Sequence, residues 1–110
     1  MLDRLSREDR LLLLKFVCAF AWTDLEITDA ERRFVKRLVE RAGLSPEDAA
    51  RVDGWLAVAP APSEVDPRNV PKEHRRVFLD AVRAMVYADG KVEEEERQNL
   101  DRLKAALESA

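Results

Sequence analysis

One motif occurs twice in the chain, and this repeat constrains the fold more than any other feature of the sequence. The first copy reads FAWTDLEITDAE over residues 20–31, and the second reads MVYADGKVEEEE over residues 85–96. Each copy joins an apolar stretch to an acidic one, as a tight turn between two helices does. Repeated units of this kind cannot bury their apolar faces alone. We therefore expect two helix-turn-helix units, at about 7–43 and 72–108, that pack on each other and are linked by residues 44–71.

The repeat extends into the helices on both sides of the turns. Placing Asp24 on Asp89 brings identical or similar residues together: Val17 with Val82, Ala19 with Ala84, Trp22 with Tyr87, Ile27 with Val92, Glu31 with Glu96, Arg32 with Arg97, Arg37 with Arg102 and Leu38 with Leu103. The similarity thus covers the second half of one helix, the turn and the first half of the next.

Length and composition favour one all-helical domain. A chain of 110 residues can form a hydrophobic core without metals or disulfides. Good helix formers are abundant and glycine occurs only three times. The 19 basic and 22 acidic side chains nearly balance, whereas a nucleic-acid-binding protein usually carries a basic excess. We therefore expect an all-α single domain, 1–110, of about five main helices with no nucleic-acid partner.

Capping signals mark the start of three helices. Ser6 and Ser45 can each accept the free amide hydrogens of a new helix, and Pro46 suits a first helical position. Thr28 with Glu31 has the pattern of a capping box. The expected helices cover about 7–23, the segment from the Thr28 cap to a left-handed Gly43, 46–58, 72–88, and a last helix with Leu100, Leu103 and Leu107 on one face.

Two further expectations concern the middle of the chain. The third helix is expected to bury Val52, Trp55 and Leu56. Four prolines in residues 59–71 forbid a continuous helix and mark the connection between the repeats, with room for one short helical turn near 63–65.

The apolar run at 11–22 predicts a central buried helix. About a dozen residues are too few for the roughly 20 that a membrane-spanning helix needs, so we expect no membrane span. Cys18, the only cysteine, lies in this run and cannot form an intramolecular disulfide. A reducing compartment, the cytoplasm, is the expected location.

The second turn resembles the back half of a calcium-binding EF-hand loop. Asp89 is followed by glycine, then by the aliphatic Val92 and the closing Glu96. With Asp89 at the fifth position of such a loop, the first and third ligands would be Met85 and Tyr87. Thioether and aromatic groups cannot replace the oxygen ligands that calcium requires, so neither copy is a conventional EF-hand.

Two interpretations of the acidic turns remain open. If the repeats pair about a pseudo-twofold axis, Asp24, Glu31, Asp89 and Glu96 could together bind a divalent cation such as calcium. Alternatively, the acids only end one helix and cap the next.

The paired sequences YADGKVEEEER and WTDLEITDAER resemble the twin signature of the tellurite-resistance TerB-like family, which also includes the N-terminal domain of the membrane-anchored co-chaperone DjlA. The resemblance extends from about Leu11 to Leu107. It implies an all-helical cytoplasmic domain with a pseudo-repeat, linked to metal-oxyanion and other stress responses. It also implies a metal site at the matching positions Asp24, Glu31, Asp89 and Glu96. Thr23 and Leu25 depart from the signature.

No arrangement typical of an enzyme is present in the sequence. His74, the only histidine, has no serine or cysteine partner in a recognisable nucleophilic pattern, so we expect a non-enzymatic protein. A basic strip lies on the second helix and an acidic patch begins the last one, at 93–96. Such charged strips are usually solvated faces, but opposite patches could instead bind a protein partner or a second copy of the chain. We therefore expect a binding or adaptor module of a stress response, or else an interaction or oligomerisation domain that binds no metal.

Overall fold

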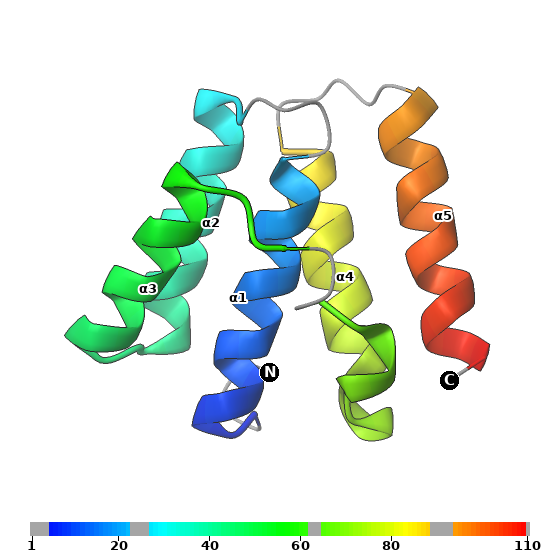
Figure 1. Cartoon of the computed structure of the whole chain (residues 1–110), viewed down its shortest axis with the longest axis horizontal. Coiled ribbons are helices and arrows are strands. Elements are labelled where there is room, and N and C mark those ends of the chain that lie inside the picture. The colour runs from blue at the N-terminus through cyan, green and yellow to red at the C-terminus, as the bar shows by residue number, and fades with distance from the viewer. Residues whose placement is uncertain (1–4, 23–26, 62–64, 89–93, 110) are drawn as a thin grey trace.

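A computed structural model describes residues 5–22, 27–61, 65–88 and 94–109. Over these residues the chain has five α-helices and no β-strand, which confirms the all-α prediction. The elements are α1 (Arg7–Ala21), α2 (Asp29–Ala42), α3 (Pro46–Ala57), the 3-10 turns η3 (Pro67–Asn69) and η4 (Lys72–His74), α4 (Arg75–Val86) and α5 (Glu94–Ser109). They form one globule with a radius of gyration of 12.8 Å (Figure 1).

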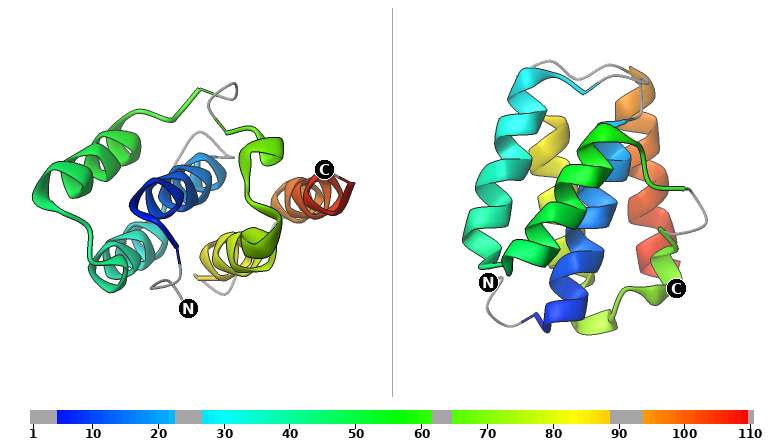
Figure 2. Two further views of the ribbon diagram at one scale, coloured as in Figure 1. Left: turned by 90° about the horizontal axis from the view of Figure 1, so that it is seen from below. Right: turned by 60° about the vertical axis from the view of Figure 1, so that its left-hand side comes forward.

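Helix α1 lies at the centre of the molecule. It packs against α2, α3 and α4, and Figure 2 shows these helices around it when the bundle is viewed along its length. Its completely buried side chains include Leu13, Leu14 and Val17. Phe16 meets Phe78 of α4 edge to face, with ring centroids 5.7 Å apart. The prediction of a central buried helix is therefore confirmed. In the described part of the chain, no helix is both long and apolar enough to cross a membrane.

The predicted helix caps are present. The Ser6 hydroxyl accepts a hydrogen bond from the Asp9 amide at 3.1 Å, and the Ser45 hydroxyl accepts one from the Asp48 amide at 3.2 Å. Gly43 ends α2 with a φ of 64°, a left-handed conformation that glycine adopts without strain. The cap positions could be predicted because each depends only on its neighbours along the chain.

Two details of the expected helices are wrong, and a third is not tested. The segment 72–88 is not one helix, because η4 covers its first turn and α4 begins at Arg75. The expected turn near 63–65 lies mostly outside the described residues. A short turn, η3, begins at Pro67, where the Asp66 carboxylate accepts a hydrogen bond from the Arg68 amide at 2.9 Å. Trp55 is only half-buried, and the Lys15 ammonium lies over its ring, 5.2 Å from the ring centroid.

Helix α5 forms one side of the molecule. It packs against α4 and η3, and it runs antiparallel to α4 (Figure 1). Leu100, Leu103 and Leu107 are buried on its inner face, as the spacing predicts. Helices α1 and α2 form a second antiparallel pair, whereas the pseudo-repeat itself stays a prediction.

Candidate functional site

Of the four predicted cation ligands, the structure describes Glu31 and Glu96. Glu31 lies in the first turn of α2 and is only 6% exposed. Its carboxylate accepts the Thr28 amide hydrogen at 2.9 Å, and the Thr28 hydroxyl accepts the Glu31 amide hydrogen at 3.1 Å. The capping box is thus confirmed, and it explains a glutamate at this position without any metal. Asp24 and Asp89 lie outside the described residues.

Glu96 is half-buried in the first turn of α5. The first turns of α2 and α5 lie at the same end of the molecule, but α1 and α4 stand between them (Figures 1 and 2). Within the described ranges, no group of three or more Asp, Glu, His or Cys side chains is arranged to hold a metal ion. The predicted cation site therefore depends on Asp24 and Asp89.

Neither Cys18 nor His74 is placed for nucleophilic chemistry. Cys18 is fully buried, and this burial raises the pKa of its thiol to about 12, so the thiol stays protonated at neutral pH. The His74 Nε2 atom lies 4.0 Å from the Asp9 carboxylate, where a protonated imidazole would pair with it. Both residues are explained by packing and by local charge.

Asp48 is an unexpected buried carboxylate. It lies in the first turn of α3, is 2% exposed, and accepts two hydrogen bonds from the Arg7 guanidinium of α1, at 2.7 and 3.0 Å. The hydrogen bond from Arg7 holds the pKa of Asp48 below its usual range against the opposing effect of burial. Both members of the pair are satisfied by each other, so the contact fixes α3 on α1 and offers no free group for chemistry.

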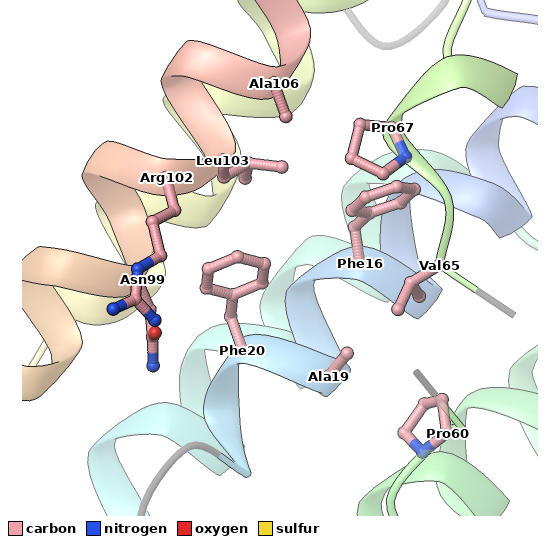
Figure 3. A pocket seen from close by; sticks show the side chains of 10 residues that line it. All are labelled: Phe16, Ala19, Phe20, Pro60, Val65, Pro67, Asn99, Arg102, Leu103 and Ala106. Carbon is pink, nitrogen blue, oxygen red and sulfur yellow. The ribbon is translucent and has the colours of Figure 1, made fainter. Parts of the chain in front are cut away.

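The described residues do form a hollow between α1, α5 and the connection that precedes η4, which we call the α1–α5 pocket (Figure 3). Its volume is about 530 Å³. The lining residues are Phe16, Ala19 and Phe20 from α1, Pro60, Val65 and Pro67 from the connection, and Asn99, Arg102, Leu103 and Ala106 from α5. The pocket exists because α5 packs mainly against α4 and η3, which leaves space between α5 and α1.

The α1–α5 pocket has an apolar body and one polar side. Phenylalanine, proline and leucine side chains form most of its wall. Asn99 and Arg102, one turn apart on α5, lie together across from the Phe20 ring (Figure 3). Arg102 is exposed and forms no ion pair with any described residue. This arrangement suits an apolar ligand that carries a carboxylate or another anion beside its apolar part.

Sequence reasoning missed this pocket. Arg102 was noted only as the repeat partner of Arg37, and Pro67 only as one of the prolines that interrupt the helices. No local signal places the connection beside α1 and α5, because that depends on how distant segments pack.

Comparisons of the chain with models of known protein families, with curated proteins and with solved structures found no match. The TerB-like resemblance therefore stays an expectation from the repeated turns.

Proposed function

We propose that this chain is a non-enzymatic binding or adaptor module that holds an apolar segment of a partner protein in the α1–α5 pocket. The observation that supports this proposal is the apolar hollow beside Arg102, which forms no ion pair with a described residue. Its volume of about 530 Å³ falls in the roughly 300–1,000 Å³ range of typical ligand pockets. Following the TerB-like resemblance, the module would work in the cytoplasm in a response to tellurite, other metal oxyanions or related stress.

The partner segment is defined by the two sides of the pocket. Its apolar side chains would replace water against Phe16, Phe20 and Leu103. An acidic residue one helical turn away would reach Arg102, whose planar guanidinium can donate two parallel hydrogen bonds to one carboxylate. Helical segments that present apolar residues on one face bind grooves in this way.

A charge-swap experiment tests the pocket. Two labelled helical peptides would share two phenylalanines on one face and differ by glutamate or lysine one turn away. We expect the glutamate peptide to bind about tenfold more tightly, because a charge-assisted hydrogen bond contributes about 1.5–3 kcal/mol. Arg102→Glu should reverse this preference. Fluorescence anisotropy measures both affinities.

Two controls separate the pocket from the general surface. Arg33→Glu changes the charge equally at an exposed position of α2 and should leave the preference unchanged. Ala106→Trp fills the pocket and should weaken the binding of both peptides. Equal binding of the two peptides to every variant would contradict the proposal.

The second candidate is a cation-responsive TerB-like module. It is supported by the position of the helix ends that flank the acidic turns: α1 and α4 end, and α2 and α5 begin, at one end of the molecule (Figure 1). Residues 23–26 and 89–93 connect these ends. Asp24, Asp89 and Glu96 would supply oxygen ligands, with Glu31 shared between capping and the ion.

Calorimetric titration of chelator-treated protein with calcium, magnesium, manganese and zinc tests this second candidate. If a cation site exists, binding is saturable and is lost in Asp89→Asn and Glu96→Gln. If the acids only cap helices, the titration gives no heat beyond dilution. Ser6→Ala is the control, because losing the cap of α1 should cost about 1 kcal/mol of folding stability while the capping box that holds Glu31 stays intact.

A further inference from the structure

A second hollow lies between α4 and α5, and we call it the α4–α5 groove. It shares no residue with the α1–α5 pocket and has a volume of about 480 Å³. Its lining residues are Lys72 of η4, Arg75, Arg76, Leu79, Asp80 and Arg83 of α4, and Lys104, Leu107 and Glu108 of α5. Because α4 and α5 run antiparallel, basic residues from distant parts of the sequence meet along one surface.

The α4–α5 groove carries an excess of positive charge although the whole chain is slightly acidic. Five basic residues line it against two acidic ones, whereas the net charge of the chain is −3. The only acidic partner of any of these cations in the described structure is Asp80, which lies 4.0 Å from Arg76, and both side chains are exposed. Lys72, Arg75, Arg83 and Lys104 form no ion pair with a described residue. Such a concave cluster attracts anions.

Arg75 gives an independent sign of a missing acceptor. Its Nε atom is buried and donates no hydrogen bond to any described protein atom. A buried donor without a partner costs free energy, and a charged one costs more. The start of α4 next to it also lacks a side-chain cap, since neither Pro71 nor His74 caps η4 or α4. An anionic oxygen in the groove would satisfy Arg75 and would lie near the positive end of α4.

We propose that the α4–α5 groove binds the phosphate groups of a small molecule. Phosphate fits better than a single carboxylate because the five cations and two carboxylates that line the groove leave an excess of three positive charges. Arginine guanidinium groups match phosphate oxygens with paired hydrogen bonds, and lysines add point charges. Leu79 and Leu107 provide an apolar wall for the body of the same molecule. This function is separate from the partner site in the α1–α5 pocket.

Titration with inorganic pyrophosphate and with ATP tests the groove, using calorimetry at low and at high ionic strength. We expect saturable binding that weakens with salt. Arg75→Gln and Lys104→Gln should each reduce the affinity about tenfold, because each removes one charge-assisted contact. Arg33→Gln removes the same charge from an exposed position of α2 and should change little. Thermal melting followed by circular dichroism tests whether the variants are folded. Lys104→Gln should disturb the fold less than Arg75→Gln, because Lys104 is exposed.

Vesicles distinguish a free phosphate compound from a lipid headgroup. Vesicles containing phosphatidylglycerol that compete with pyrophosphate would identify a headgroup as the natural source of the phosphate, and vesicles that do not compete would identify a soluble compound. The absence of pyrophosphate and ATP binding at low salt would overturn the proposal, even if the vesicles or duplex DNA bind. Equal losses of pyrophosphate affinity in Arg33→Gln and Arg75→Gln would also overturn the proposal, since binding would then depend on net charge alone.

Discussion

Replacing Phe78 with alanine is expected to lower the free energy of unfolding by about 4 kcal/mol. Phe78 is 1% exposed on α4, and it meets Phe16 of the central helix edge to face, with an interplanar angle of 78°. The substitution removes buried apolar area, leaves a cavity and loses the ring pair, which alone contributes roughly 0.5–1.5 kcal/mol. A domain typically has about 5–15 kcal/mol of stability in all, so the variant would lose a large share of it.

Urea denaturation followed by circular dichroism measures this loss. Phe34→Ala is the matched control, because Phe34 of α2 is only half-buried at the edge of the core and should cost clearly less. Phe78→Leu keeps most of the volume and should also cost less than the alanine variant. Similar losses for Phe78→Ala and Phe34→Ala would contradict the central position of the ring pair.

The Asp48–Arg7 pair is expected to make stability depend on pH. The pKa of Asp48 is lowered in the folded protein by its hydrogen bonds with Arg7, so the ionised form stabilises the fold. This stabilisation is fully present above the ordinary aspartate pKa of about 3.9 and is lost as the pH falls through the lower folded value. Asp48→Asn should therefore destabilise the protein strongly at pH 7 and much less in acid.

The melting temperatures of the unchanged protein and of Asp48→Asn, measured from pH 7 down to below the ordinary aspartate pKa, test this expectation. Asp66→Asn is a matched control, because the pKa of Asp66 is also lowered, but by the nearby Arg68. That contact spans two residues and is largely exposed, so it can form without the fold and should contribute little. If the melting temperatures of Asp48→Asn and the unchanged protein differ by the same amount at every pH, the expectation is contradicted.

Local rules predicted the helices well. Ser6, Thr28 and Gly43 mark helix ends because a cap needs only residues within one turn of it. The buried face of α5 likewise follows from the spacing of its leucines. The break between η4 and α4 was missed, since the segment after Pro71 can adopt either kind of turn and its surroundings decide.

The candidate sites were harder to predict because they depend on contacts between distant segments. Arg7 and Asp48 are 41 positions apart, and nothing near either residue indicates the other. The α1–α5 pocket and the α4–α5 groove likewise depend on how α5 packs against the other helices. Glu31 is the converse case, because its pattern was visible in the sequence but was compatible with two roles, a cation ligand or a helix cap. The observed hydrogen bonds confirm the capping role.

Helix α5 supplies a wall to both hollows: Leu103 faces the pocket and Leu107, one turn later, faces the groove. It is held mainly by α4 and η3, whereas α1 is surrounded on several sides. Any transient detachment of α5 would dismantle both sites at once. A ligand in either site would therefore oppose that detachment and favour binding at the other, so the two sites would be thermodynamically linked through the attachment of a single helix.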